Sequence, residues 1–350
     1  MTDRTLLTNT HPALRRCWHP VARSREIGEQ PVRVMLLGEP LVAFRSGGAV
    51  VVFADRCPHR GTPLSLGCAE SGGVRCAYHG WRFDADGCCD EIPALGADAV
   101  IPARARLAPV AGVEERLGMV FVALGPDEPL PGARLPEVPE DGDPAFVAGD
   151  LPILAARASA GLLADNFLDT AHFPFVHAAT FGAGEAREVG RFEVSREPGE
   201  LAFRARYEHL FANREDPGVA AGVRPLVQTR RLTYSLVAPF HLSLRIDFVD
   251  AGGTNTIGFF LQPESEERCR IFSTIWRNDL EGDADRLQEA VDFEVKVVEE
   301  DLRIQEAFDR LALPLDPTVE LHTRADRTTV ELRRVLADLV AAADGGGSAQ

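Results

Sequence analysis

The chain has 350 residues, which is long for a single core and predicts about two domains. Its composition is that of a globular protein, with 45% hydrophobic and 26% charged residues, and no run approaches the roughly 20 apolar residues that span a bilayer. The net charge of −16 argues against nucleic acid as a partner, because its phosphates would be repelled.

The chain begins with MTDRTLLTNTHPALRR, which lacks the apolar core of a signal peptide, so we expect a cytoplasmic protein outside the membrane. Short apolar or alternating runs then follow from Val32 to Gly125, and Gly, Pro and Asp-Gly turns separate them. These runs are VRVMLLG, PLVAFRS, GAVVVFA, GWRFDADGCC and GMVFVALG. Because no amphipathic helix pattern interrupts them, we predict an all-β domain over residues 1–125.

The rest of the chain has a different character. Residues 126–145 are rich in proline and acidic side chains and are predicted to form a linker. Residues 146–340 combine a helical segment, ASAGLLADNFLDTAHF, with six strand-like runs and a long helix from about Asp283 to Ala312. The pattern predicts an α+β domain of helix-grip type, in which an antiparallel sheet holds the long helix. Residues 341–350, AAADGGGSAQ, are predicted to be a disordered tail.

Two short pairs of potential metal ligands stand inside the predicted β domain. They are Cys57-x-His59 and Cys76-x-x-His79, with 16 residues between them. Structural zinc accepts two cysteines and two histidines, but its cysteines more often come in C-x2–4-C pairs. A Rieske [2Fe–2S] centre needs two cysteines on one iron and two histidines on the other. Since each pair here offers one thiolate and one imidazole, the spacing favours the cluster over zinc.

A second concentration of ligand-type side chains lies in DNFLDTAHFPFVH, residues 165–177. Asp169 and His172 are three residues apart and share a helical face. His172 and His177 are five apart, which on a regular helix places them about 140° around the axis. A helix that stops or bends near Phe173–Pro174 would bring both imidazoles to one point.

Two histidines and one carboxylate form the facial triad that binds Fe(II) and leaves positions for dioxygen and substrate. We expect the carboxylate on the apolar stripe of the long helix, where an acidic side chain is costly unless it is paired or bound to metal. Asp301 and Glu294 both fall on that stripe, so spacing alone does not choose between them, and either could instead form a salt bridge with an arginine. His209 and His241 fall in predicted strands. Each could line the substrate pocket or be a structural residue.

Both motifs resemble those of Rieske non-haem iron oxygenases. The C-x-H-x16-C-x-x-H-G-W pattern is similar to the cluster motif of Rieske proteins, and EEDLRIQEAF resembles the segment that supplies the third iron ligand, which maps to Asp301. The pattern N-x-x-D-x-x-H-x4-H is similar to the mononuclear-iron motif and is met by Asn166, Asp169, His172 and His177. Respiratory Rieske proteins carry a disulfide cysteine in each loop, whereas Tyr78 stands at that position here, as in the oxygenases.

The resemblance extends from about Trp18 to Leu339 and implies how the residues work. It implies a [2Fe–2S] cluster on Cys57, His59, Cys76 and His79, and a mononuclear Fe(II) on His172, His177 and Asp301. It further implies a head-to-tail homotrimer in which Asp169 couples this iron to a cluster histidine of the neighbouring subunit. A separate reductase or ferredoxin would supply electrons, since the chain has no Gly-x-Gly-x-x-Gly motif after a strand.

The implied activity is that of a terminal oxygenase. It would hydroxylate or oxidatively demethylate a small aromatic or natural-product substrate with O2, as do the single-subunit vanillate and dicamba O-demethylases that the chain resembles. Dihydroxylation and oxidative cyclisation would use the same irons, and the metal set does not choose among these reactions. An alternative of another class is a Rieske electron carrier with a non-catalytic ligand-binding domain, against which the presence of His172, His177 and Asp301 argues.

Overall fold

The computed structural model describes residues 5–96, 100–125, 128–182, 187–214 and 216–345. The chain forms two compact units. Thr10–Pro131 make up one, called the N-terminal unit below, and Met1–Asn9 join Gly132–Gln350 in the other, called the C-terminal unit. None of the described helices is long and apolar enough to cross a membrane.

The N-terminal unit is built from antiparallel strands and single turns of 3-10 helix, which confirms the predicted all-β character. Its strands form three small sheets, in the orders β10–β11–β2, β3–β4–β5 and β6–β7–β8–β9. The strands are β2 (His19–Arg23), β3 (Val32–Leu36), β4 (Glu39–Ser46), β5 (Ala49–Ala54), β6 (Cys68–Glu70), β7 (Gly73–Arg75), β8 (Arg82–Phe83), β9 (Cys89–Glu91), β10 (Gly112–Arg116) and β11 (Met119–Ala123). The 3-10 turns are Pro12–Arg16, Ser24–Glu26, Leu64–Leu66 and Pro93–Leu95.

The core of this unit extends up to the Cys/His loops, because both cysteine side chains belong to it. They pack in one buried cluster with Val42, Phe44, Phe53, Leu64, Val74 and Phe83. The segment between the two loops approaches its neighbours so closely that side chains do not fit at two positions. A Cβ on Gly67 would lie 2.1 Å from the carbonyl oxygen of Arg75, and one on Gly73 the same distance from that of Phe83.

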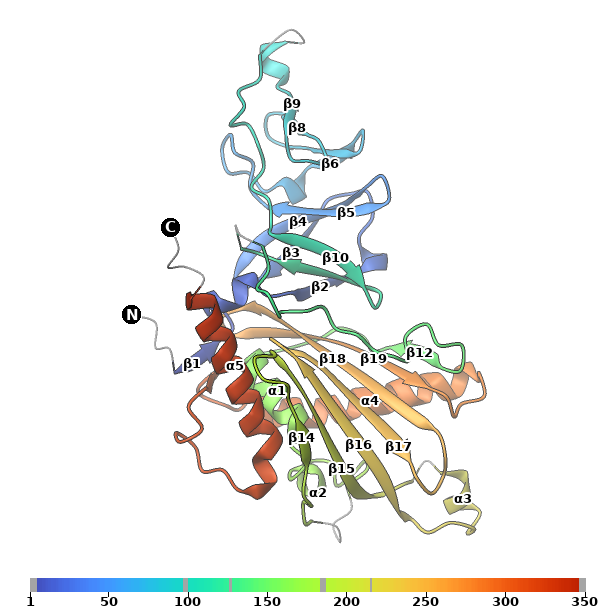
Figure 1. Ribbon diagram of the computed structural model, residues 1–350. Helices are drawn as coiled ribbons and strands as arrows, with labels where there is room; N and C mark the ends of the chain where they lie inside the picture. The colour runs from blue at the N-terminus through green and yellow to red at the C-terminus, as the bar shows by residue number, and fades with distance from the viewer. Residues whose placement is uncertain (1–4, 97–99, 126–127, 183–186, 215, 346–350) are drawn as a thin grey trace. The chain divides into compact units, whose positions relative to one another are not determined.

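The C-terminal unit contains an eight-stranded antiparallel sheet of order β12–β19–β18–β17–β16–β15–β14, with β13 also paired to β19 (Figure 1). Buried and exposed side chains alternate along β15 and β16, so one face of the sheet forms the core. The strands are β12 (Val147–Asp150), β13 (Leu154–Ala156), β14 (Glu193–Ser195), β15 (Ala202–Ala212), β16 (Val227–Val237), β17 (His241–Phe248), β18 (Thr254–Ser265) and β19 (Arg268–Arg277).

Helix α4 lies along one face of this sheet, with α1 beside it (Figure 1). The carboxylate of Asp283 caps α4 by accepting from the N–H groups of Asp285 and Arg286, at 2.9 and 3.2 Å. Strand β12 approaches α4 at Gly149, where a Cβ would lie 2.8 Å from Val291. The helices are α1 (Ala160–Leu168), α2 (Phe173–Val176), α3 (Pro217–Ala220), α4 (Ala284–Gln305) and α5 (Arg327–Gly345), with a 3-10 turn at Arg324–Asp326. The sheet with its long helix confirms the predicted α+β class.

Two segments differ from the sequence-based prediction at the end of α4 and at the start of the chain. The long helix ends at Gln305 rather than near Ala312, and Ala312–Pro314 form strand β20 instead. The pairing of Ala312–Pro314 with Leu6–Thr8 holds this segment as a strand and keeps it out of the helix. β20 pairs with β1 (Leu6–Thr8), so the first strand of the chain belongs to the C-terminal unit and not to the β domain predicted over residues 1–125.

The last helix was not expected as an element of its own. Four apolar side chains of α5 are completely buried, Leu332, Val335, Leu336 and Leu339, and its Arg333 forms ion pairs with Asp165 and Glu320. Because α5 continues to Gly345, residues 341–345 are helical rather than a disordered tail, and 346–350 lie outside the described residues.

Candidate metal centres

The two Cys/His pairs lie on loops with the same backbone hydrogen bonds. The N–H of Gly61 donates to the carbonyl of Cys57 at 2.9 Å, and that of Gly80 donates to the carbonyl of Cys76 at 3.1 Å. In each loop the cysteine N–H donates back to the residue after that glycine, at 2.8 and 2.9 Å. Both glycines have a φ of +73°, a conformation that side chains disfavour, which explains why each pair is followed by glycine.

The two thiols are buried and the two imidazoles lie toward the surface. Cys57 and Cys76 are each 2% exposed, whereas His79 is exposed and its ring centroid lies 4.4 Å from that of His59. The ring of Trp81 stacks on His59 with centroids 4.6 Å apart. Nδ1 of His59 is buried and accepts or donates no hydrogen bond within the described part of the chain, so it is free to bind a metal.

The surroundings of the Cys57 thiol determine how readily it ionises. Burial, with a smaller contribution from Cys76, raises the pKa of the Cys57 thiol to about 11, while the N–H groups of His59 and Arg60 act in the opposite direction. A thiolate there therefore needs the positive charge of a metal. Among the described residues, only His172, His177 and Asp301 bring three ligand atoms within 4.8 Å of one another.

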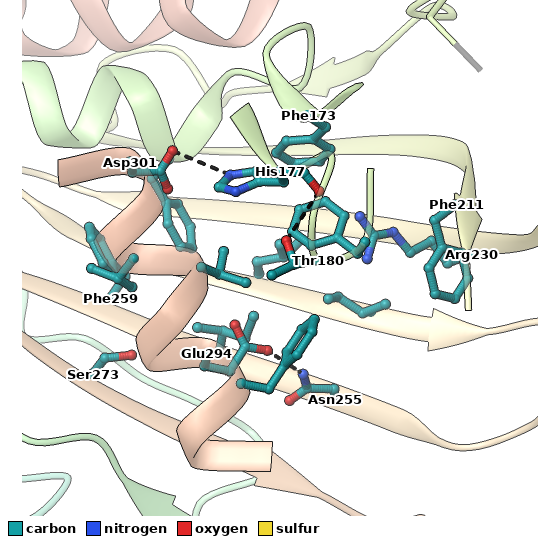
Figure 2. A pocket seen from close by; sticks show the side chains of 18 of the residues that line it. Phe173, His177, Thr180, Phe211, Arg230, Asn255, Phe259, Ser273, Glu294 and Asp301 are labelled. Atoms are coloured by element: carbon teal, nitrogen blue, oxygen red, sulfur yellow. Dashed lines mark hydrogen bonds and ion pairs between the residues drawn. The ribbon is translucent and has the colours of Figure 1, made fainter. Parts of the chain in front are cut away.

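Three ligand-type atoms converge in the C-terminal unit. The Nε2 atoms of His172 and His177 are 3.1 Å apart, and each is 3.3 Å from Oδ1 of Asp301. Figure 2 shows the contact between His177 and Asp301. Three ligands at right angles around one ion, each about 2.1 Å from it, would have their atoms about 3.0 Å apart. The three atoms therefore have the spacing of a facial triad. Glu294, the other acid on the stripe, is instead bonded to Asn255 at 3.1 Å.

The two histidines reach this point because the chain breaks between two helices. α1 ends at Leu168, Asp169 has extended dihedrals (φ −84°, ψ 137°), and His172 and His177 flank the short helix α2. The break is therefore before His172, not at Phe173–Pro174 as predicted. Pro174 lies in the first turn of α2, where its missing N–H leaves no bond unmade.

Two known families match the two units. Residues 17–109 match the Rieske [2Fe-2S] domain, and residues 156–342, more than half of the chain, match the vanillate O-demethylase oxygenase C-terminal domain. The chain belongs to the Rieske oxygenases. Its cofactors are accordingly a [2Fe–2S] cluster and a mononuclear iron, and the chain is an oxidoreductase rather than an electron carrier or a zinc protein.

This Rieske oxygenase is similar to some relatives over most of their length and to others over less than half of it. Methylxanthine N3-demethylase NdmB of Pseudomonas putida is 28% identical over 92% of this chain and 88% of its own. The 3-chlorobenzoate-3,4-dioxygenase oxygenase subunit of Comamonas testosteroni is 37% identical, but over 49% of this chain and 40% of the relative.

Solved structures share the fold. The NdmA QL mutant of Pseudomonas putida CBB5 with theobromine has a TM-score of 0.77 and 26% identity over 93% of this chain and 90% of that one. Dicamba monooxygenase bound to dicamba has a TM-score of 0.76 over 94% of this chain and 98% of that one, and at 22% identity it is a likeness of fold alone.

A carboxylate is hydrogen-bonded to the Nδ1 atom of each histidine of the triad, on the side of the ring opposite to the Nε2 atom that faces the other ligands. Nδ1 of His172 is 3.0 Å from Asp169, and Nδ1 of His177 is 2.8 Å from Oε2 of Glu300, which also accepts from the Thr180 hydroxyl at 3.0 Å. Such partners fix the ring orientation and tautomer of metal-binding histidines. Glu300 was not among the site residues predicted from the sequence. It directly precedes Asp301 and is 8% exposed.

The charges in the triad are strongly coupled. Burial opposes the charge on Asp301, but His172 and His177 outweigh it and lower the pKa of this carboxyl to about 2. Burial likewise lowers the pKa of His172, but Asp169 and Asp301 outweigh it and raise this pKa to about 9. The site without metal therefore holds a proton that a bound cation would replace.

A cavity opens beside the triad, entirely within the C-terminal unit (Figure 2). Its walls are mainly apolar and include Leu163, Phe167, Leu244, Ile246, Phe248, Ile257, Phe259 and Phe293. A small number of polar side chains interrupt them, among them Asn255, Glu294 and Arg230. The Nδ2 group of Asn255 donates to Glu294, whereas Oδ1 of Asn255 is buried with no hydrogen-bond partner in the described chain. An apolar cavity with a few polar groups is typical of a small-molecule site.

Proposed function

We propose that this Rieske oxygenase is the terminal component of a monooxygenase system, and that it hydroxylates or oxidatively demethylates a small aromatic substrate. The observation that carries the proposal is the triangle of ligand atoms, 3.1–3.3 Å apart, in the wall of a cavity lined by phenylalanine and aliphatic side chains. Relatives named as methylxanthine demethylases, which cover most of the chain, support demethylation. Hydroxylation of an O-methyl or N-methyl carbon gives a hemiacetal or hemiaminal. This intermediate product releases formaldehyde and leaves the demethylated compound.

We propose that His172, His177 and Asp301 bind the mononuclear iron, and that Cys57, His59, Cys76 and His79 bind the cluster. When bound, these groups supply single-electron transfer and the reduction of dioxygen. The residues of the chain do the rest. Asp169 and Glu300 hold the imidazole rings by their Nδ1 atoms, and the apolar walls keep bulk water from the carbon to be oxidised.

We also propose that the two units are a cluster domain and a catalytic domain, and that a separate reductase or ferredoxin feeds electrons to the first. In a head-to-tail homotrimer Asp169 would link the iron site to a cluster histidine of the partner subunit. The side chain of Asp169 supports this role, because it is 28% exposed, although Oδ2 is bonded to His172 and Oδ1 accepts from the N–H of Ala171 at 2.8 Å. The seven unpaired cysteines suit a reducing compartment such as the cytoplasm.

Metal analysis and product analysis test the proposal together. Purified protein should contain about three irons per chain and no zinc. With a surrogate reductase and isotopically labelled dioxygen, methoxylated and N-methylated aromatics should yield products that carry one labelled oxygen. His172→Ala should abolish product while the visible absorption of the cluster remains. Turnover by this variant would contradict the assignment.

A further inference from the structure

Arg230 carries a buried charge that no carboxylate in the described part of the chain contacts. It lies on β16 with its side chain turned inward and is 5% exposed. Within the described residues its only hydrogen bond runs from Nε to Nδ1 of His209, at 3.2 Å. Burial lowers the pKa of Arg230 to about 10, so the guanidinium keeps its charge at neutral pH. A buried charge is costly unless it is paired, and although Glu294 acts on Arg230 electrostatically, no carboxylate in the described chain is hydrogen-bonded to the guanidinium.

The surroundings of Arg230 orient the guanidinium and leave most of its donors unused. His209 is its neighbour on β15, and burial together with Arg230 lowers the pKa of this histidine to about 3, so it stays neutral and accepts the Nε hydrogen. Three phenyl rings surround Cζ, with centroids at 5.7 Å (Phe173), 4.7 Å (Phe181) and 4.6 Å (Phe211). A guanidinium has five N–H donors, so four remain on the two Nη atoms.

These donors belong to the same cavity as the iron triad. Arg230 lines it together with His177 and Asp301, and Figure 2 shows Arg230 beside Phe211 on the side of Thr180. Phe181 connects the two places, because it contacts the guanidinium and also stacks on His177 with centroids 4.8 Å apart. The guanidinium and the triad thus share one cavity and one packing neighbour, Phe181.

We propose that Arg230 binds a carboxylate carried by the substrate and thereby fixes the aromatic ring with the carbon to be oxidised at the triad. This inference rests on the proposed function and narrows it, since it makes the substrate an aromatic acid and not a neutral heterocycle. A planar guanidinium matches a carboxylate with two parallel N–H···O bonds, and it does so best where water is excluded. The Nη atoms make no hydrogen bond within the described residues and are available for such a partner.

Binding of matched acids and amides to the iron-loaded protein tests this proposal without any turnover. Isothermal titration under anaerobic conditions should show methoxybenzoates binding roughly ten- to hundredfold more tightly than the corresponding methoxybenzamides. Arg230→Gln should remove this preference. Arg231→Gln is the matched control, because Arg231 is the next residue on β16 but is half-exposed and paired with Glu208, and it should leave the preference unchanged.

The wild-type measurement decides even if Arg230→Gln does not fold, because equal affinity for acids and amides would overturn the proposal. A folded Arg230→Gln protein, judged by its melting temperature and cluster absorption, that still prefers acids would also overturn it. The outcomes separate this inference from the proposed function. If neutral aromatics were oxidised as readily as acids, only the role proposed for Arg230 would be wrong. If acids bound selectively but were never oxidised, only the proposed function would be wrong.

Discussion

The two metal centres of this chain are assembled in different ways. The Cys57 loop follows β5 and the Cys76 loop joins β7 to β8, and each is closed by its own backbone hydrogen bonds and a glycine of positive φ. The iron triad instead joins the two ends of α2 to the C-terminal part of α4, which is distant in sequence. The first centre therefore depends on local geometry. The second depends on the packing of a helix on a sheet, and it needs further carboxylates to hold its ligands.

The largest effect is expected at the carboxylate of the triad. Asp301→Asn should remove about one of three irons and lower turnover by roughly a thousandfold or more, because an amide oxygen is a weak ligand for Fe(II). The cluster, held by other loops, should keep its absorption. Glu294→Gln is the control, since Glu294 lies on the same helix and lines the same cavity but is bonded to Asn255. Loss of iron in the control instead would assign the ligand to Glu294.

The difference between the centres also explains what the sequence could predict. The spacing of Cys57, His59, Cys76 and His79 is itself the geometry of two adjacent loops, so the pattern alone indicated a cluster. At the iron site, residue spacing left Asp301 and Glu294 equivalent, because both lie on the buried stripe of α4. Only the docking of α4 distinguishes them, and it brings Asp301 to within 3.3 Å of both histidines.

Other features could not be predicted because they depend on partners far along the chain. Glu300 gains its role only when α4 brings it to His177, and nothing in the local sequence requires that contact. β1 looks like part of the following β domain until its partner, β20, is known. The helix break before His172 was misplaced because Pro174 was taken as a breaker, although in a first turn it is compatible with a helix.

Acid should destabilise the N-terminal unit through a buried neutral histidine, His19. Burial lowers the pKa of His19 in the N-terminal unit to about 4. Between that value and the unfolded value of about 6.5, the unfolded chain binds more protons, so the free energy of unfolding falls as the pH falls. The loss attributable to His19 is about 3 kcal/mol.

Denaturant titrations between pH 4 and 7 measure this loss, with cluster absorption as the probe of the N-terminal unit. The Nε2–H group of His19 donates to the Leu14 carbonyl at 2.9 Å. In His19→Gln the side-chain amide can donate to the same carbonyl, but it does not titrate. The variant should therefore show a flatter dependence than the wild-type protein over this range. Equal slopes for the two proteins would show that His19 is not the group responsible.

A smaller effect, on iron affinity, is expected from Glu300, whose carboxylate is hydrogen-bonded to His177. Glu300→Gln keeps the shape of the side chain but weakens its bond to Nδ1 of His177, so iron affinity should fall by about ten- to a hundredfold. Competition with a chelator measures this change, and the cluster should be unaffected. Glu299→Gln, at the exposed neighbouring position, should bind iron as the wild-type protein does. If both variants lost iron equally, the effect would come from helix charge and not from the hydrogen bond to His177.

The smallest effect tests how local the cluster centre is. Cys68 is an exposed thiol at the start of β6, between the two loops, and its strand neighbour is Arg75. If the loops alone hold the cluster, Cys68→Ser should change neither the iron content nor the absorption, and stability should stay within about 0.5 kcal/mol. Cys57→Ser is the contrast, because it removes a buried thiol from the core of the unit and should abolish the cluster absorption. A spectrum altered by Cys68→Ser would mean that this nearby thiol can replace one of the four proposed ligands. The cluster centre would then be less strictly determined by its two loops than the iron triad is by its docked helix.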